Sequence, residues 1–578
     1  MNSPMSSLQS FSLLAPEIIL VAAALTAFLG GAFAGLRSGW AVALAGIVAA
    51  MLVAGGQPTD GAWVASGGIR IDAFSAYIRW MVLALGAILA LVQAGDLFRS
   101  AVTRRSGFRN AGARSDSHSG TLSSTMEGST CEEAGTFLIL LAGLSLAAVA
   151  DDLVLLFIGL ELVSIPTYIL LALKRTDAHG QEASLKYFFL SLVASALFLY
   201  AVVCLYGIGG STNLAVIGER LRSAADPLTS MATVLLPVAI GMTLAGAAFR
   251  LAAVPMHFYA PDVYEGTSPG NAALLSTLPK IAGIVVLVRV LALAILPADA
   301  SGDQVVGGAA AAHLSLFWPL TATLAAVTMT VGNLMALVQR NLRRLLACSS
   351  IAHAGYLLVG IAAAAASAAA RADQNGAQAG DMSWTLGLGG LSASLFYLST
   401  YVLATAGIFA AVTYLGHRWP EWTAGSGPRP PREEIANVDD LDGLSTTNPV
   451  AAFAMTLFLL SLAGIPPLPG FWGKLSLATS ALEVDWNSAL ASGNRRTWFV
   501  SLAVVLVINA AIAAAYYLRI IAAMYFRTAK RGVQADGGIA AGVAMLLCTA
   551  LLLMVTLQPR GLFVSSSRAG DVIEKTNR

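Results

Sequence analysis

Runs of apolar residues, each long enough to cross a lipid bilayer as an α-helix, recur along the whole chain. A bilayer core about 30 Å thick takes roughly 20 apolar residues in helical form. Lipid offers the backbone no hydrogen-bond partners, so only helices or closed barrels span it, and no barrel-type strand pattern appears. We count about 14 such runs, from Phe11–Leu36 to Ile539–Leu557. The sequence therefore predicts an all-α polytopic membrane protein.

Composition supports this class and excludes others. The 578 residues are 57% hydrophobic and only 11% charged, whereas a soluble globular chain has about 25% charged residues. The near balance of 34 Lys and Arg against 32 Asp and Glu argues against nucleic acid as a partner. The first basic residue is Arg37, so the first run lacks the basic start of a signal peptide and is expected to stay as a helix.

Metal and cofactor sites are not expected in this chain. Its four cysteines are scattered without a metal-binding spacing, and its six histidines form no cluster. The glycines Gly207, Gly209 and Gly210 lie between apolar runs, which is typical of a loop and not of a phosphate-binding motif. The sequence thus predicts no redox, nucleotide or metal site.

Basic residues predict the orientation, because cytoplasmic loops are enriched in Lys and Arg. Five basic clusters fall in alternate loops, after spans 3, 5, 9, 11 and 13, and include Arg104/Arg105, Lys174/Arg175, Arg343/Arg344, Arg429/Arg432 and Lys530/Arg531. Those loops are expected to be cytoplasmic, which places both termini in the periplasm of a bacterial inner membrane.

The expected organisation has five parts. Residues 1–100 hold helices 1–3, and residues 101–133 form a polar, Ser- and Gly-rich cytoplasmic loop. Residues 134–300 hold helices 4–8, and residues 315–530 hold helices 9–13 with a cytoplasmic connector at 417–448. Helix 14 and a tail occupy residues 535–578.

Four ionisable residues lie inside apolar spans, and they are the main functional signal: Glu161, Arg250, Lys280 and Lys474. A charge at mid-membrane costs a few kcal/mol or more on insertion scales, so such residues are paired, face water or function in transport. A structural salt bridge or snorkelling toward a helix end is the alternative for each one. Lysine and carboxylate are the chemistry of proton transfer, so the four together favour a proton path.

Proline breaks accompany two of these charges. Val254-Pro255 follows Arg250, and the run from Gly464 to Gly470, with three prolines, precedes Lys474. The broken spans are the seventh and the twelfth, which is the fourth position of each unit if helices 4–8 and 9–13 are five-helix repeats. Broken helices in corresponding halves are typical of inverted-repeat transporters.

Other polar residues are weaker candidates. Lys186, one turn from Glu182, either snorkels or takes part in a relay. His353 either gates or carries protons, or is a packed ring, while His257 with Asp262 and Glu265 is expected to line a cytoplasmic entrance. A structural or partner-facing role is expected for Glu17, Arg79, Arg289 and Arg519.

Several runs resemble a known family. They are GLELVSIPTYILLAL, EASLKYFFLSLVASALFLY, FRLAAVPMHFYAPDVYEGTSP, SSIAHAGYLLVG and SLAGIPPLPGFWGK. They are similar to subunit N, an antiporter-like membrane subunit of bacterial NADH:quinone oxidoreductase (respiratory complex I). The likeness extends from about Pro16 to about Tyr525.

The resemblance implies 14 helices with inverted repeats at helices 4–8 and 9–13, and translocation of protons driven by quinone reduction elsewhere. The family's helix-5 glutamate and its helix-8 and helix-12 lysines fall on Glu161, Lys280 and Lys474. Its helix-7 lysine falls on Arg250, a departure, because arginine does not release its proton in proteins.

The resemblance also implies partners. These are the other membrane-arm subunits, among them a sister antiporter-like subunit and small membrane subunits, with NADH, FMN, iron–sulfur clusters and quinone bound by partner subunits. A cation/proton antiporter, alone or as one chain of several, is the alternative function, and a structural scaffold is a third.

Overall fold

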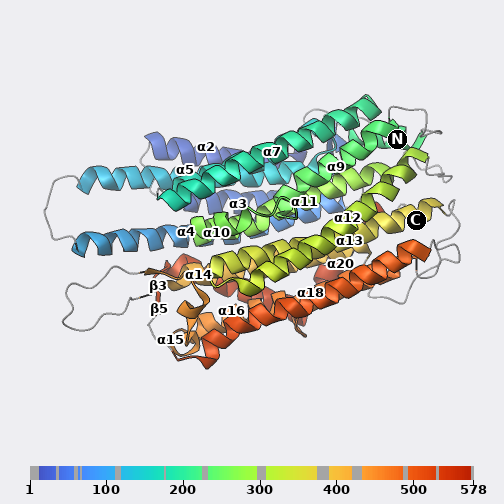
Figure 1. Ribbon diagram of the computed structural model, residues 1–578. Coiled ribbons are helices and arrows are strands. Elements are labelled where there is room, and N and C mark those ends of the chain that lie inside the picture. The colour runs from blue at the N-terminus through green and yellow to red at the C-terminus, as the bar shows by residue number, and fades with distance from the viewer. Residues whose placement is uncertain are drawn as a thin grey trace.

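A computed structural model describes residues 12–33, 38–57, 63–65, 68–110, 119–174, 177–223, 232–295, 308–373, 389–418, 433–485, 493–528 and 533–574. Long helices run side by side across the full depth of the molecule (Figure 1). In the first half these are α2 Ala15–Phe33, α3 Gly39–Gly55, α4 Ala73–Asn110, α5 Ser119–Val149, α6 Leu153–Lys174, α7 Ala178–Gly209, α9 Ala232–Leu251 and α11 Pro269–Ile295. In the second half they are α12 Gly308–Val338, α13 Leu342–Asp373, α14 Gly390–Leu415, α16 Pro449–Ala463, α17 Pro469–Glu483, α18 Gly493–Phe526 and α19 Gly538–Leu557.

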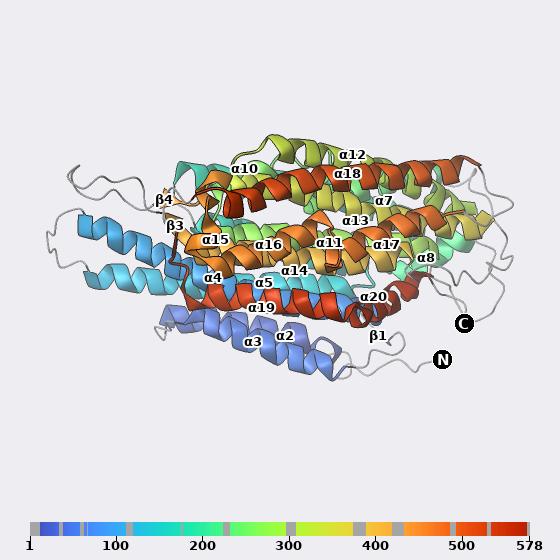
Figure 2. The same ribbon diagram turned by 90° about the horizontal axis from the view of Figure 1, so that it is seen from below.

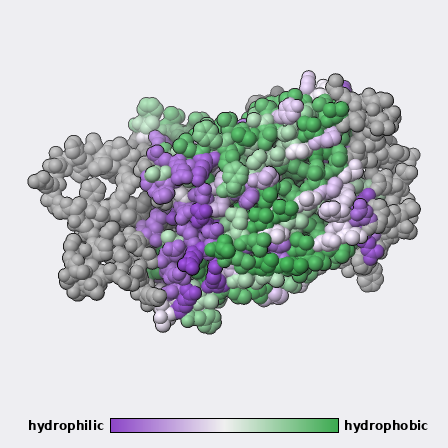
Figure 3. Space-filling view, viewed as in Figure 1, coloured by the Kyte–Doolittle hydropathy of each residue, from purple (hydrophilic) through white to green (hydrophobic). Residues whose placement is uncertain are grey.

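Twelve helices within the described ranges are long and apolar enough to cross a membrane. Two further apolar helices, α3 and α16, are shorter. The polytopic all-helical fold class is confirmed, whereas the total of 14 spans stays a prediction. The face in Figure 3 is apolar across its middle, with a polar band near the end where strand β3 lies, as a lipid-facing surface requires.

Both expected breaks are present. Helix α9 ends at Leu251 and the short helix α10, Ala260–Gly266, follows; α16 ends at Ala463 and α17 begins at Pro469. The first broken helix ends at Leu251, before the Val254-Pro255 step that marked the break in the sequence. Helical backbone is disfavoured in the residue before a proline, and the chain already leaves the helix at Ala252, whose φ is +55°.

The two polar segments expected to be connectors contain regular structure. Helix α4 continues to Asn110 and helix α5 begins at Ser119, so most of the predicted loop 101–133 is helical. A helix propagates at low cost once its first turn is formed, so an apolar span can extend into a polar segment. In the second connector, β3 (Gly416–Arg418) pairs with β4 (Glu433–Glu434) and β5 (Val533–Ala535).

Several short elements were not predicted from the sequence. They are too short or too polar to stand out as spans. They are the hairpin of β1 Trp63–Ala65 and β2 Ile69–Ile71 and the helices α8 Leu214–Ser223, η1 Val438–Leu441, α15 Leu444–Thr447 and α20 Pro559–Glu574. Leu13, just before α2, packs with Ile69 and Val149 at the end of the bundle opposite β3, and α20 lies at that same end (Figure 2).

Helices α11 and α13 form the centre of the bundle, and their apolar segments are buried along their whole length. Glycines allow close helix contacts here: a Cβ on Gly355 of α13 would lie 2.5 Å from the backbone nitrogen of Met329 on α12. Small residues at helix interfaces are the usual means of tight packing in membranes. This packing places any charge on α11 or α13 far from lipid.

The charges expected to be structural do make internal contacts. Arg79 binds both carboxylate oxygens of Glu17 at 2.9 and 2.5 Å, which joins α4 to α2. Arg289 contacts Asp72 at 3.3 Å, and Arg519 donates to the carbonyl oxygens of Leu337 and Gln339. These arginines stabilise helix packing.

Candidate functional site

The first helix break ends in a motif that reverses the chain. The amide of Ala253 donates to the carbonyl of Ala248 at 2.7 Å, and the amide of Ala252 donates to Phe249 at 3.0 Å. This pair of bonds, with a left-handed residue at Ala252, is the Schellman ending of a helix. The carbonyl of Leu251 is left without an intrahelical partner at this point.

The second break ends in the same way. The amide of Ile465 donates to Leu460 at 3.1 Å and that of Gly464 to Ser461 at 3.0 Å. Gly464 has a φ of +84°, a conformation that glycine adopts without steric cost. The carbonyls of Leu462 and Ala463 are then free to accept other donors.

A buried lysine occupies the end of each broken helix. Lys280 of α11 donates to the carbonyl oxygen of Leu251 at 2.6 Å and to that of Ser350 on α13 at 2.8 Å. Lys474 of α17 donates to Leu462 at 2.8 Å and to Ala463 at 3.0 Å. The side chains are 1% and 5% exposed, and neither makes an ion pair in the described part of the chain. Positive charge at a helix C-terminus is electrostatically favourable.

Glu161 and Arg250 form the pair of the first half. Arg250 Nη2 lies 3.7 Å from Glu161 Oε1, and Arg250 Nη1 donates to Ser164 Oγ at 2.9 Å. Ser195 of α7 donates to the same Glu161 oxygen at 2.5 Å. Arg250 is 7% exposed, but Glu161 is 26% exposed at the surface of α6, so it is less enclosed than its place in an apolar span predicts.

Tyrosine rings and His353 connect the two lysines. Lys280 Nζ lies 5.9 Å from the centre of the Tyr401 ring, and Lys474 Nζ lies 4.9 Å from that of Tyr356. The His353 ring lies between them, 4.8 Å from Tyr401 and 5.7 Å from Tyr356.

Both ring nitrogens of His353 are hydrogen-bonded. Nδ1 lies 2.5 Å from the hydroxyl of Tyr397, and Nε2 lies 2.9 Å from that of Tyr517. Neutral imidazole needs one donor and one acceptor, and a hydroxyl can be either. The ring can therefore exchange a proton with its neighbours without leaving a buried atom unpaired.

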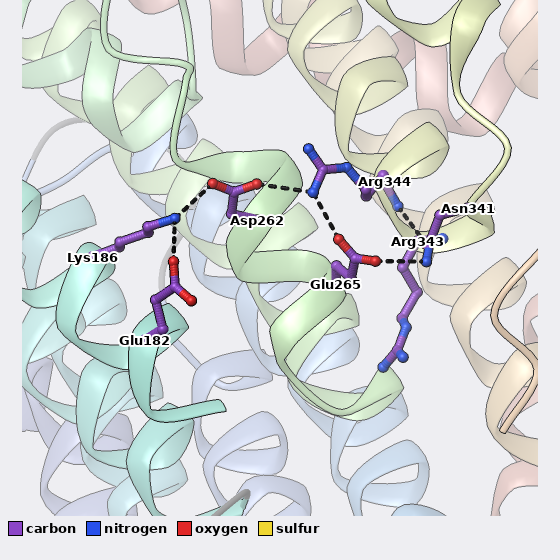
Figure 4. A network of polar contacts seen from close by, with 7 residues as sticks. All are labelled: Glu182, Lys186, Asp262, Glu265, Asn341, Arg343 and Arg344. Atoms are coloured by element: carbon purple, nitrogen blue, oxygen red, sulfur yellow. Dashed lines mark hydrogen bonds and ion pairs between the residues drawn. The ribbon is translucent and has the colours of Figure 1, made fainter. Parts of the chain in front are cut away.

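A second group of charges borders a cavity of about 380 Å³. Lys186 of α7 binds Glu182 at 2.7 Å and Asp262 of α10 at 2.8 Å. Arg344 of α13 binds Asp262 at 2.9 Å and Glu265 at 2.7 Å. The side chains point toward one another from three helices (Figure 4). Asn341 adds a bond to Glu265 at 3.0 Å.

The structure places the candidate residues in two groups. Glu161, Arg250, Lys280, His353 and Lys474 lie within helices α6, α9, α11, α13 and α17, whereas Lys186, Asp262 and Glu265 line the cavity of about 380 Å³, and Figure 4 shows the contacts among them. His257 was expected to line the entrance with Asp262 and Glu265, and this stays a prediction. Its Nδ1 is buried and has no hydrogen-bond partner among the described residues.

Sequence reasoning missed two sets of residues in these groups. The tyrosines that surround His353 were not considered, although Tyr397 and Tyr401 stand at helical spacing inside an apolar span. Arg344 was noted only as part of a basic loop. Its partners come from α10, so no spacing in the sequence could have indicated them.

Comparisons with known proteins agree on one family. The model of the transmembrane family "NADH:quinone oxidoreductase/Mrp antiporter" matches residues 150–372 and 377–499. NADH-quinone oxidoreductase subunit N of Desulfovibrio desulfuricans is 33% identical over 93% of this chain and 93% of its own length. Subunit N 1 of Sorangium cellulosum is 36% identical over 72% of this chain and 71% of its own.

Solved structures show the same fold. A chain of respiratory complex I from Thermus thermophilus is 25% identical with a TM-score of 0.65, covering 96% of this chain and 99% of that one. A chain of the Mrp complex from Dietzia is 21% identical with a TM-score of 0.67, covering 97% and 98%.

Proposed function

The chain belongs to the NADH:quinone oxidoreductase/Mrp antiporter transmembrane family, as a homologue of subunit N, and from this we propose that it translocates protons in the membrane arm of a bacterial complex I. One observation supports the proposal most directly. Each broken helix ends on a buried lysine ammonium, and a histidine with two tyrosine partners lies between the two lysines. Such a row of exchangeable groups suits the transfer of protons and not of electrons.

Within this arrangement the residues have different tasks. Lys280, His353 and Lys474 are the groups that bind and release protons, and the two lysines donate to backbone carbonyls that the helix breaks leave free of helical bonds. Arg250 supplies a fixed positive charge, because a guanidinium stays protonated at any working pH. Glu161 is the titratable partner of that charge.

The cavity lined by Lys186, Asp262 and Glu265 is the cytoplasmic entrance in this proposal. Lys186 and Asp262 line it, and Arg344 joins α10 to α13 through its contacts with Asp262 and Glu265. His257 follows the first break and is a further candidate for the path between this entrance and Lys280.

The division into repeats is part of the same proposal. Residues 134–300 and 315–530 are two inverted five-helix units, each with its broken helix in fourth place. The preceding residues 1–100 and the final 535–578 flank them.

Partner subunits supply what this chain does not. NADH, FMN, iron–sulfur clusters and quinone are bound elsewhere in the complex, and the described residues contain no group of metal-ligating side chains. Glu161 is partly exposed on a face of α6 that also exposes Ile158 and Ile165. Because a charge facing lipid is costly, we infer that another membrane-arm subunit, either a sister antiporter-like subunit or a small one, covers this face.

A tagged copy expressed in its own host tests the proposal. Purification should recover an assembly that oxidises NADH, and membrane vesicles should acidify on NADH addition. Deletion of the gene should abolish both activities, and the wild-type gene should restore them. A chain that purifies alone and exchanges Na⁺ for H⁺ in liposomes would instead support the antiporter alternative. The likeness to the Mrp chain does not favour that alternative, because at 21% identity it shows a common fold alone.

The proposed location is the bacterial inner membrane with both termini in the periplasm. The four native cysteines are buried, so an added cysteine would be the main target of a membrane-impermeant thiol reagent. Ser301→Cys should be labelled in intact spheroplasts and Ser117→Cys only after the membrane is opened. Labelling of Ser117→Cys in intact spheroplasts would reverse the orientation.

A further inference from the structure

Another cavity of about 380 Å³ lies at the end of the bundle where α12 and α18 end. Its described lining consists of Arg340, Val438, Asp439, Arg519 and Arg527, of which three are arginines. They come from the turn after α12, from η1 and from the end of α18. We call this space the arginine cavity. From the sequence, Arg519 was expected to have a structural or partner-facing role, and no ligand was expected here.

Hydrogen bonds hold the walls of the arginine cavity together. The amide of Val438 in η1 donates to the carbonyl of Arg340 at 3.0 Å, and the amide of Gly443 donates to the carbonyl of Ala523 on α18 at 3.1 Å. The guanidinium of Arg519 joins α18 to two carbonyls where α12 ends. The fold therefore positions the arginines around a formed space, whereas arginines that only extend to the membrane surface need no such walls.

The three arginines differ in their partners. Arg527 binds Asp439 at 2.6 Å and Asp442 at 3.3 Å. Arg340 and Arg519 make no ion pair with a described residue. The carbonyls that accept from Arg519 carry no charge, and its Nε is buried without a hydrogen-bond partner among the described residues. A guanidinium presents a planar fork of donors that fits phosphate, so the lining favours a phosphate group.

Apolar surface leads up to the arginine cavity along both helices. Val338 precedes Arg340 by two residues and is 76% exposed, and Phe526 directly precedes Arg527 and is 86% exposed. Helices α12 and α18 pack against each other. Further exposed apolar side chains recur along them at helical spacing, and these are Leu320, Val327 and Leu334 on α12 and Val504, Val507, Ile508, Leu518 and Tyr525 on α18. The arginines thus stand at the end of a long apolar face.

We infer that the arginine cavity binds the headgroup phosphate of an anionic phospholipid whose acyl chains lie along α12 and α18. One molecule accounts for both observations, since its phosphate reaches the arginines and its chains cover the exposed apolar side chains. Basic pockets between transmembrane helices on the cytoplasmic side suit anionic lipid headgroups, and α18 ends on that side in the proposed orientation. The inference goes beyond proton translocation and does not depend on it.

Two other occupants each fit only one of these observations. Free phosphate would match the arginines but would leave the apolar face without a partner. A transmembrane helix of a partner subunit would cover the apolar face but would leave the guanidinium donors unused. A zwitterionic lipid would match the apolar face, but its headgroup carries an ammonium group that the arginines repel.

Photo-crosslinking in a defined bilayer tests the inference. The purified complex is placed in phosphatidylcholine vesicles with a trace of phosphatidylglycerol that carries a photoreactive group in its acyl chain. A phosphatidylcholine probe with the same acyl chain is the zwitterionic comparison. Cross-linked peptides should contain the ends of α12 and α18, around Val338 and Phe526. The anionic probe should label them about fivefold more than the zwitterionic probe.

Variants of Arg340 are the sharpest, because its side chain makes no ion pair in the described structure and the complex should fold without it. Arg340→Gln should lower labelling by the anionic probe about fivefold per complex. Arg340→Lys should restore part of it, because lysine keeps the charge but not the fork of donors. The matched control is Arg560→Gln, which removes the charge of an exposed arginine on α20, at the other end of the bundle. It should leave labelling unchanged.

An excess of inorganic phosphate separates the two sources of a phosphate group. It should leave labelling by the lipid unchanged, and loss of labelling would assign the cavity to a free anion and overturn the inference. Equal labelling by the two probes, or an unchanged yield in Arg340→Gln, would overturn it by showing that lipid contacts the helices without using the arginines.

The assembled complex also reports whether another subunit occupies this face. Cross-links on other helices with none on α12 and α18 would mean that a partner subunit covers the apolar face, and the inference would be wrong. The cross-linking needs neither NADH nor a proton gradient. A failure of the proposed function would appear in vesicle acidification and leave these results unchanged.

Discussion

The two helix breaks have the same backbone ending but different charges around it. Both close with a Schellman motif and both present free carbonyls to a lysine ammonium. At the second break Lys474 belongs to α17, the continuation of the broken helix. At the first break Lys280 comes from the separate helix α11, and Arg250 precedes the break with Glu161 as its partner.

Under the proposed function, this difference predicts that the two halves use different groups to exchange protons. In the proposed function the second half has Lys474, on the continuation of its own broken helix, as the proton-exchanging group at its break. In the proposed function the first half adds to its own lysine, Lys280, a permanent cation, Arg250, with Glu161 as its titratable partner. A change at Arg250 should therefore alter the field around Glu161, whereas a change at Lys474 should remove a proton carrier.

Loss of either lysine is the largest expected effect. Lys280→Ala and Lys474→Ala should each lower NADH-driven proton pumping at least about tenfold, since a positioned proton-transfer group contributes 10²–10⁴-fold. The complex should still assemble, because within the described residues the ammonium of each lysine contacts backbone carbonyls and an aromatic ring and makes no ion pair. Pumping is measured in vesicles with equal amounts of complex. Normal pumping in either variant would return that lysine to a structural role.

Variants of Arg250 test the difference between the two halves more directly than variants of the lysines do. Arg250→Lys should keep most activity, because it keeps the charge near Glu161, and Arg250→Ala should lose roughly tenfold. Glu161→Ala should resemble Arg250→Ala, and Glu161→Asp should be milder. Protons pumped per NADH are measured for all four. Full pumping by Arg250→Ala would show that the first half needs no cation at this position.

Gly464→Ala should have an intermediate effect. The new Cβ would lie 2.9 Å from Lys474 Cδ, and a φ of +84° costs a non-glycine residue about 1–2 kcal/mol. Pumping should fall severalfold, less than in Lys474→Ala, because the ammonium is displaced and not removed. The control is Gly561→Ala on α20, where an added Cβ meets nothing within 4 Å. Equal pumping in both variants would contradict the expected contact.

Ala252→Gly should have the smallest effect and the opposite sign. It places glycine at the first break, where Ala252 now has a φ of +55°, and should stabilise the ending by up to about 1 kcal/mol. Pumping should stay at the wild-type level while the inactivation temperature of the complex rises slightly. A fall in pumping would mean that the strained alanine, unlike Gly464, has a role in the first half.

The sequence alone determined the class of protein and which two spans are broken. Runs of apolar residues admit only helices in lipid, and prolines next to charges mark where those helices end. For the same reason Glu161, Arg250, Lys280 and Lys474 were recognisable: a charge within an apolar span is rare and costly. Their roles in proton transfer stay predictions.

Only the tertiary structure decided which groups meet. Lys280 reaches Leu251 from a helix 29 residues further along the chain, and the 2.6 Å contact depends on how α9 and α11 pack. The union of Lys174 with Asp96 and Glu133 depends likewise on three helices, and in the sequence each residue looks like an ordinary charge at the end of a span. Periodicity reports what a residue's own helix requires, whereas pairing across helices depends on packing that no local pattern contains.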